Sequence, residues 1–207
     1  LDALVEVCDN WNLVLVEDAA ESLGSFYKGT HTGTVGAFGA LSFNGNKIIT
    51  TGGGGAVLCK LNDDGIRAKH LTTQAKVPHP YEFYHDELGF NFRMPNINAA
   101  LGCAQMEQLP RFLASKRRLA HSYQNFFKNT PFQFVKEPKY AVSNYWLNAV
   151  ICPDVSSRND LLEKTNAAGV MTRPVWQLMH RLPMFAKAER GDLQYSEYLE
   201  SHLVNIP

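Results

Sequence analysis

The chain has 207 residues, of which 45% are hydrophobic and 19% charged, and its formal net charge is zero. This composition is ordinary for a globular protein of one or two domains, and the scattered basic residues give no electrostatic reason to expect nucleic acid binding. The apolar runs are far shorter than a membrane span. The four cysteines form no CxxC pair, so we expect reduced thiols, no metal centre and a cytoplasmic protein.

The first residues predict a helix, then a strand and then a loop. Apolar residues at helical spacing predict a helix over about 1–11. The continuous apolar run Leu13–Val16 is typical of a strand buried on both faces, and it ends in Glu17 and Asp18. A stretch rich in Gly, Ser and Thr follows over 19–36, which predicts a loop that lines a site.

A lysine turn separates the next predicted strands, which cover 37–43 and 48–59. The turn is Asn44-Gly45-Asn46-Lys47. Ligands bind at strand ends in α/β folds, and a lysine desolvated there becomes a nucleophile. With Asp18 at the end of the preceding strand, the pair indicates pyridoxal phosphate chemistry. In that chemistry a lysine forms a Schiff base, and an acid pairs with the pyridine nitrogen.

The middle of the chain predicts two helices and a long loop. Asn62-Asp63-Asp64-Gly65 begins a short helix that ends near His70. Residues 71–95 contain three prolines and many aromatics without a period, which predicts a functional loop and an arm at a subunit interface. A long helix is predicted over 96–129, with a break or kink at Pro110.

A domain boundary is predicted near residue 130. Residues 1–130 would be part of a large domain, and residues 131–207 would be a small α+β domain. The elements predicted in this last part are a strand near 145–152, a helix near 156–168, a strand near 170–175 and a helix near 193–203.

Five motifs along the chain, taken in order, resemble those of the DegT/DnrJ/EryC1/StrS family of pyridoxal phosphate-dependent sugar aminotransferases. They are VEDAAESLGS, YKG, GAFGALSFNGNK, TTGGGGAVL and LGFNFRMPNINAALGCAQ. The resemblance covers nearly the whole chain and is weakest at GVMTRPVWQLMH. It implies an α/β fold of the fold type I aminotransferase kind. Part of a large pyridoxal phosphate-binding domain, with a mixed, mostly parallel sheet, would precede a smaller, truncated C-terminal α+β domain.

The resemblance also implies that about a third of the family's sequence would precede Leu1, so that the chain is a fragment. That part would supply a ring-stacking aromatic and a phosphate-binding helix N-terminus. We therefore expect this chain by itself to bind the cofactor poorly.

Several residues take their roles from the resemblance. Lys47 would be the Schiff-base lysine and proton carrier, although its spacing alone fits an exposed turn lysine. Asp18 would hold the pyridine nitrogen protonated, and Ser42 would bind the phosphate. Glu21 departs from the family, which usually has Gln or His near the phenolic oxygen. A carboxylate there would be protonated or would face elsewhere. Gly53 is a second departure, since many members have an acid there.

Further residues are assigned to the partner subunit and the substrate. Asn91 would reach across a dimer interface to the partner's cofactor phosphate. Arg93 would bind sugar or diphosphate or form a structural salt bridge. Arg173 and His180, in the weakly matching segment, would be substrate contacts. The aromatic clusters Tyr81/Phe83/Tyr84 and Tyr145-Trp146 are more typical of a core than of a cofactor site.

The sequence thus predicts a homodimeric aminotransferase with shared active sites. It would move an amino group, with glutamate as the expected donor, to a nucleotide-linked 4-keto-6-deoxy sugar for surface glycan biosynthesis. The motifs look closest to members that act on UDP-linked N-acetylated sugars. One alternative is a sugar dehydratase of the same fold. Such relatives have histidine in place of the lysine, so Lys47 argues against it. Another is a non-catalytic regulatory relative. Glu21 and Gly53 favour that reading, whereas the intact Asp18 and Ser42 disfavour it.

Overall fold

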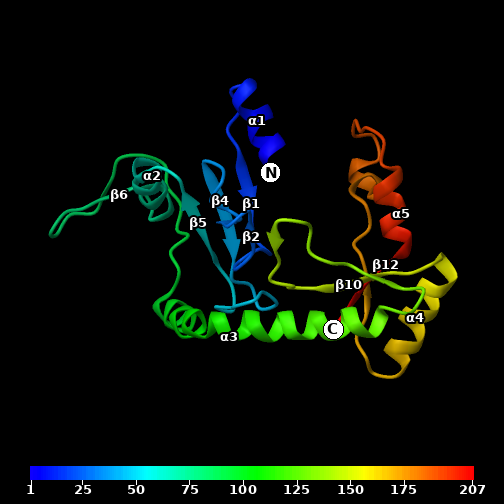
Figure 1. Cartoon of the computed structure of the whole chain (residues 1–207). Helices are drawn as coiled ribbons and strands as arrows, with labels where there is room; N and C mark the ends of the chain where they lie inside the picture. The colour runs from blue at the N-terminus through cyan, green and yellow to red at the C-terminus, as the bar shows by residue number, and fades with distance from the viewer. The chain divides into compact units, whose positions relative to one another are not determined.

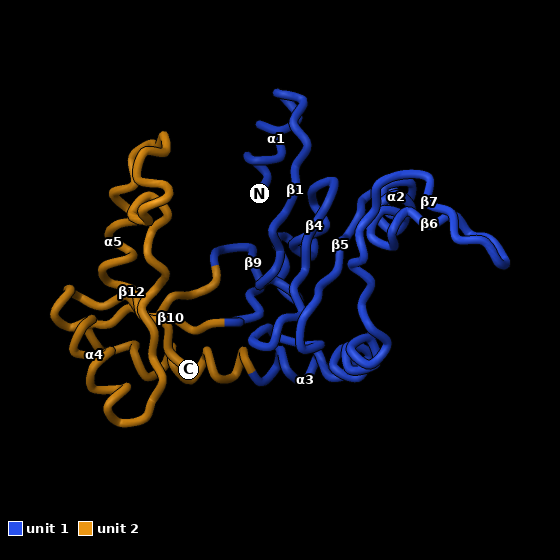
Figure 2. The backbone as a smooth tube through the Cα atoms, turned by 180° about the vertical axis from the view of Figure 1, so that it is seen from behind, with its two compact units in different colours: residues 1–115, 138–146 blue, residues 116–137, 147–207 orange.

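A computed structural model describes residues 1–207, which form two compact units (Figure 2). The first unit contains residues 1–115 and 138–146, and the second contains 116–137 and 147–207. The boundary that we predicted near residue 130 falls inside the second unit, and residues 138–146 return to the first. No helix in the structure is long and apolar enough to cross a membrane.

The first unit is built on a three-stranded mixed sheet in the order β1-β4-β5 (Figure 1). β1 and β4 are parallel, and their register pairs Asp18 with Ala40. β4 and β5 are antiparallel, and Ser42 pairs with Gly55. Because β1 and β4 run the same way, both end at the same edge of the sheet. The strands are β1 (Val16–Asp18), β4 (Phe38–Ser42) and β5 (Gly55–Cys59).

Smaller elements surround this sheet. One antiparallel sheet has the order β3-β2-β9, and a separate hairpin joins β6 to β7. These elements are α1 (Asp2–Asn10), β2 (Phe26–Tyr27), β3 (Thr30–His31), α2 (Asn62–Thr72), β6 (Lys76–Val77), β7 (Tyr84–His85), α3 (Asn96–Phe127) and β9 (Ala141–Val142).

Two predicted strands are shorter in the structure. The apolar run before Asp18 becomes strand only at Val16, and the side chains of Leu13 and Val14 are exposed rather than buried. The segment 48–51 is not a strand. Instead, Thr51 donates its N–H to the carbonyl of Phe43 at 3.0 Å, so the chain folds back on the end of β4. Tertiary contacts therefore override β-branched propensity here.

The long helix α3 is continuous through Pro110, so of the predicted break or kink there is no break. Its ribbon changes direction within its first half, as Figures 1 and 2 show. A proline inside a helix removes one hydrogen bond and crowds the preceding turn, which bends the helix without ending it when packing supports both halves.

The second unit has a four-stranded antiparallel sheet in the order β11-β12-β10-β8. Buried and half-buried residues alternate along β10 and β12, which is the period-two pattern of a sheet with one buried face. Val150 and Val204 are fully buried and pair across these strands. The elements are β8 (Gln133–Phe134), β10 (Asn148–Ile151), α4 (Val155–Ala167), β11 (Arg173–Pro174), η1 (Met179–Arg181), η2 (Pro183–Phe185), α5 (Gln194–His202) and β12 (Leu203–Ile206).

The Glu17 carboxylate fastens a loop to the central sheet. Its two oxygens accept hydrogen bonds from the backbone N–H groups of Gly33, Val35 and Gly36, each at 2.7 Å. The loop approaches so closely that a Cβ at Gly36 would lie 2.5 Å from the carbonyl oxygen of Leu15. Successive strand residues point to opposite faces of the sheet. Glu17 therefore bonds the loop, whereas the carboxylate of its neighbour Asp18 faces the other side and takes no part in these bonds.

We expect Glu17→Gln to lower the free energy of unfolding by about 2–3 kcal/mol, because an amide cannot accept three charge-assisted hydrogen bonds. Urea unfolding followed by circular dichroism measures the change. Glu6→Gln is the matched control, because Glu6 is exposed on α1, and it should have little effect. Equal stability of the two variants would contradict the role of Glu17.

Candidate active site

Asp18 and Ser42 end the two parallel strands of the central sheet. The exposed Asp18 carboxylate accepts one hydrogen bond, from the N–H of Ala20 at 3.2 Å, and forms no ion pair within the chain. The Ser42 hydroxyl accepts a bond from the N–H of Asn44 at 3.3 Å, so its own hydrogen can be donated to a ligand. One carboxylate without a cation and one available hydroxyl therefore lie at the carboxyl ends of neighbouring strands.

Lys47 is held in a tight turn just beyond β4. Its N–H donates to the carbonyl of Asn44 at 3.1 Å, and only 12% of its side chain is exposed. Its ammonium forms an ion pair with Glu21, which lies three residues after Asp18. The ordinary reading of Lys47 as an exposed turn lysine is therefore wrong. Glu21 faces the lysine, and the pair links the ends of β1 and β4.

An aromatic ring covers the lysine on another side. The Lys47 ammonium lies 4.4 Å from the centre of the Trp146 ring, within the range of a cation–π interaction. The indole N–H donates to the carbonyl of Asn46 at 2.6 Å. The sequence predicts a core position for Trp146. Its ring is instead partly exposed and lies at the lysine turn. No sequence pattern indicates this contact, because a hundred residues separate its partners.

Asn144 anchors the segment that carries Trp146. Its side chain is only 4% exposed, and its amide nitrogen donates to the carbonyls of Glu21 at 2.6 Å and Leu23 at 3.1 Å. Its amide oxygen accepts from the N–H of Trp146 at 2.9 Å, and its own N–H donates to the Ser25 hydroxyl at 3.0 Å. Both the nitrogen and the oxygen of the buried amide are thus hydrogen-bonded, and these bonds join two segments that are distant in the sequence.

The remaining predicted residues lie elsewhere. Asn91 forms an isolated β-bridge with Thr73, and Arg93 lines a hollow between α2 and the β4-β5 strands. Arg173 and His180 belong to the second unit. The Arg173 guanidinium donates to the side-chain oxygen of Asn166 at 3.3 Å, and His180 lies 3.1 Å from the Glu197 carboxylate. The structure therefore brings Asp18, Glu21, Ser42 and Lys47 together at one edge of the central sheet of the first unit.

The sequence profile described as the DegT/DnrJ/EryC1/StrS aminotransferase family matches residues 1–207. This chain belongs to that family. The predicted membership is confirmed.

Individual members of the family are similar over most of the chain. It is 38% identical over 191 residues to the "Putative pyridoxal phosphate-dependent aminotransferase EpsN" of Bacillus subtilis (strain 168), covering 91% of this chain and 48% of that protein. It is 37% identical over 189 residues to the GDP-perosamine synthase of Escherichia coli O157:H7, covering 90% and 51% respectively. The chain thus spans about half the length of the curated relatives that it matches.

The fold is shared with solved aminotransferases of this kind. The structure superposes on aminotransferase TlmJ from Streptoalloteichus hindustanus with a TM-score of 0.89 and 25% identity, covering 98% of this chain and 55% of that one. The predicted fold class, part of a fold type I aminotransferase with a mixed sheet, is confirmed. Pyridoxal phosphate is the cofactor of the family, as predicted.

The residues at the sheet edge fit this cofactor. Asp18 offers an unpaired carboxylate for a protonated ring nitrogen, Ser42 offers a hydroxyl hydrogen for a phosphate, and Lys47 offers a shielded primary amine. Glu21 is the unusual member. Its ion pair places the carboxylate against the lysine, which answers the sequence-based question of where it faces.

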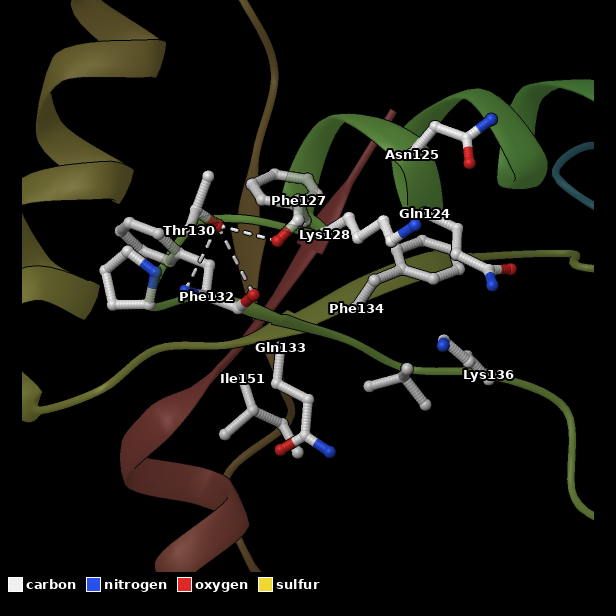
Figure 3. Close-up of a pocket in the computed structure, with 12 residues that line it drawn as sticks. Gln124, Asn125, Phe127, Lys128, Thr130, Phe132, Gln133, Phe134, Lys136 and Ile151 are labelled. Carbon is white, nitrogen blue, oxygen red and sulfur yellow. Dashed lines mark hydrogen bonds between the residues drawn. The ribbon is translucent and has the colours of Figure 1, made fainter.

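A hollow in the second unit is lined by residues from the end of α3 to β8, and one of them, Thr130, donates its hydroxyl hydrogen to the carbonyl of Phe127 at 3.0 Å (Figure 3). The lining combines polar and aromatic side chains but none of the predicted site residues. The lining residues include Gln124, Asn125, Lys128, Phe132, Gln133 and Lys136.

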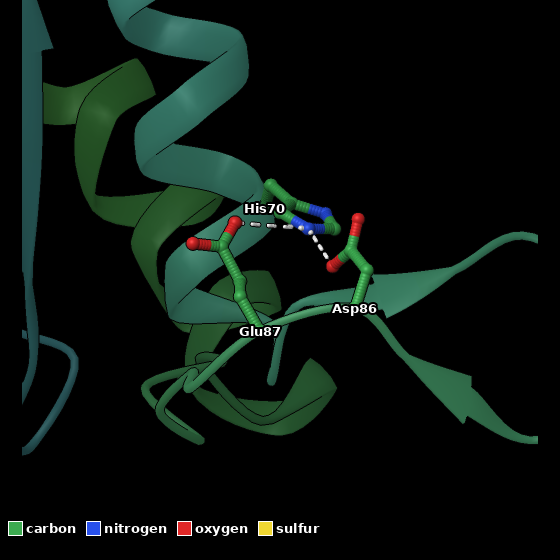
Figure 4. Close-up of side chains that lie close together, drawn as sticks. All are labelled: His70, Asp86 and Glu87. Carbon is green, nitrogen blue, oxygen red and sulfur yellow. Dashed lines mark hydrogen bonds and ion pairs between the residues drawn. The ribbon is translucent and has the colours of Figure 1, made fainter.

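A cluster of His70, Asp86 and Glu87 joins α2 to the end of β7 (Figure 4). The His70 ring lies 2.7 Å from Asp86, which lowers the pKa of that carboxyl, and a hydrogen bond from Arg67 lowers the pKa of Glu87. Because Arg67 contacts both oxygens of Glu87, the carboxylate already has its cation. The cluster is an ion-pair clasp that holds the hairpin to α2.

We expect Asn144→Asp to lower the free energy of unfolding by at least about 2 kcal/mol at neutral pH, because a carboxylate would face two carbonyl oxygens in a buried position. Only the protonated acid can donate there, so the pKa of the new carboxyl is raised in the folded state. The loss should therefore shrink as the pH falls. Urea unfolding at two pH values tests this, with the exposed Asn129→Asp as the control. A loss that does not depend on pH would contradict the two Asn144 donor bonds.

Proposed function

We propose that the chain is the core of a cytoplasmic pyridoxal phosphate-dependent aminotransferase. Its substrate would be a nucleotide-linked 4-keto-6-deoxy sugar, its amino donor glutamate, and its product a precursor of surface glycans. The observation that carries the proposal is the shielded Lys47 amine beside the strand ends that present Asp18 and Ser42. The name of one relative, GDP-perosamine synthase, supports a nucleotide sugar as the substrate.

Each residue of the site has a task in this chemistry. Pyridoxal phosphate, when bound, supplies an electron sink that stabilises negative charge on the carbon that gains or loses the amino group. Asp18 would keep the ring nitrogen protonated, and Ser42 would donate a hydrogen bond to the phosphate. Lys47 would hold the cofactor through its amine, and its Nζ would be the base that moves a proton between the cofactor carbon and C4 of the sugar.

The outer residues complete the proposal. Arg93, Arg173 and His180 would contact the sugar nucleotide, and Asn91 would bind the cofactor phosphate of a partner subunit in a homodimer. Exposed aromatic side chains on the arm over 71–95 support an interface, because a lone molecule would leave them in water. Their exposed fractions are 79% for Tyr81, 83% for Phe83, 61% for Tyr84, 49% for Phe90 and 71% for Phe92.

The assignment of Lys47 can be tested covalently. Borohydride reduction of the full-length protein with pyridoxal phosphate should add a pyridoxyl mass to the peptide that contains Lys47. Lys47→Arg keeps the charge opposite Glu21 but cannot form the bond, so the label should disappear. Lys60→Arg, an exposed control, should leave it in place. A label on another lysine in the wild-type protein would refute the assignment, and no label at all would favour a regulatory relative.

The shared active site can be tested by mixing inactive variants. In a dimer of Lys47→Ala with Asn91→Ala, one site carries both changes and the other carries neither, so mixing should restore part of the transaminase activity. Mixing Lys47→Ala with Asp18→Asn is the control, because those residues belong to one subunit and every hybrid site stays damaged. If verified subunit exchange restores nothing, and Asn91→Ala alone is impaired, then Asn91 acts within its own subunit.

A further inference from the structure

The indole of Trp146 lies against the amine on which the proposed function depends. Its ring centre is 4.4 Å from the Lys47 ammonium, and the Glu21 carboxylate contacts the same ammonium. The ring belongs to the segment 138–146, which joins the first unit from a distant part of the sequence. The site would therefore be incomplete without a residue that no motif of the central sheet contains.

The position of the ring is set independently of the lysine. The indole N–H donates to the carbonyl of Asn46 at 2.6 Å, and the backbone N–H of Trp146 donates to the Asn144 side chain at 2.9 Å. Asn144 is itself buried and bonded to the backbone of Glu21. The indole and the backbone of Trp146 are thus both hydrogen-bonded to the segments that carry Lys47 and Glu21. The position of the ring therefore does not depend on its contact with the lysine side chain.

An ion pair alone would hold the lysine weakly. Nearly half of the Glu21 side chain is exposed, at 46%, and water and salt screen such a pair. The indole face attracts the cation at 4.4 Å, and this second contact restricts the lysine to fewer rotamers. The side chain of Lys47 is only 12% exposed, and the Trp146 ring lies against its charged end.

We propose that Trp146 is a positioning residue for Lys47. Its indole face, together with Glu21, holds the ammonium at the sheet edge and keeps the amine aimed at the place where the cofactor attaches. This inference rests on the proposed function for its purpose, but the restraint itself exists in the cofactor-free protein. It can therefore be measured without any turnover.

The first measurement is competitive acetylation of the cofactor-free protein, read for each lysine by peptide mass spectrometry. Trp146→Leu should raise the labelling rate of Lys47 relative to Lys60 by about two- to fivefold, the ratio expected when a partly exposed cation–π contact is lost. Trp146→Phe keeps an aromatic face and should stay near the wild-type ratio. An unchanged ratio in Trp146→Leu, or an equal rise in Trp146→Phe, would overturn the proposal.

A second measurement separates positioning from general damage. The rate of borohydride-trapped pyridoxal phosphate attachment at Lys47 should fall in Trp146→Leu, although the lysine reacts faster with the small reagent. Loss of folding would instead raise labelling at every lysine, which Lys60 and the melting curve would report. Trp176→Leu, whose ring is 70% exposed in the second unit, is the matched control and should change neither rate. Changes in the control like those in Trp146→Leu would overturn the proposal.

The two proposals can fail separately. If no pyridoxyl mass ever appears on Lys47 while its labelling rises in Trp146→Leu, the proposed function fails and the restraint on the lysine stands. If the pyridoxyl mass appears equally fast in the wild type and in Trp146→Leu, the function stands and the positioning role of Trp146 fails.

Discussion

The parallel pairing of β1 with β4 is the constraint on which the site depends. Parallel strands end at the same edge of a sheet, so the register that sets Asp18 beside Ala40 also places Ser42 nearby. In β1, the two adjacent acids Glu17 and Asp18 have different roles. Glu17 points to the loop over 33–36 and satisfies three backbone N–H groups there, whereas Asp18 keeps a carboxylate without an ion pair.

The site is assembled from three stretches that are far apart in the sequence. The ends of β1 and β4 supply Asp18 and Ser42, and the turn after β4 supplies Lys47. The segment 138–146 then returns to the first unit and adds Trp146 through the buried amide of Asn144. A fully bonded buried amide specifies one arrangement, because any other leaves its donors unpaired at a cost comparable to a lost hydrogen bond.

The arm over 71–95 has a base held by ion pairs and exposed apolar side chains beyond it. Its base is held to α2 by the clasp of Arg67, His70, Asp86 and Glu87. Beyond the clasp, large apolar side chains lie in water, for example Phe83 at 83% exposed. Surface ion pairs contribute little stability but do orient what they join. The clasp therefore presents the apolar arm in a defined direction, as a surface that binds another molecule would require.

The sequence by itself determined the family, the fold class and the four residues that meet at the sheet edge. Strand ends, glycines and an ordered set of motifs are local features, and Asp18, Glu21, Ser42 and Lys47 could be selected from them. The contacts of these residues were not local. Only the tertiary structure paired Glu21 with Lys47, carried α3 through Pro110, and moved Trp146 from an expected core position to the lysine. Each of these outcomes depends on packing and hydrogen bonds between segments that are distant in the chain. A pattern of neighbouring residues contains no information about them, since local propensity yields wherever such contacts are stronger.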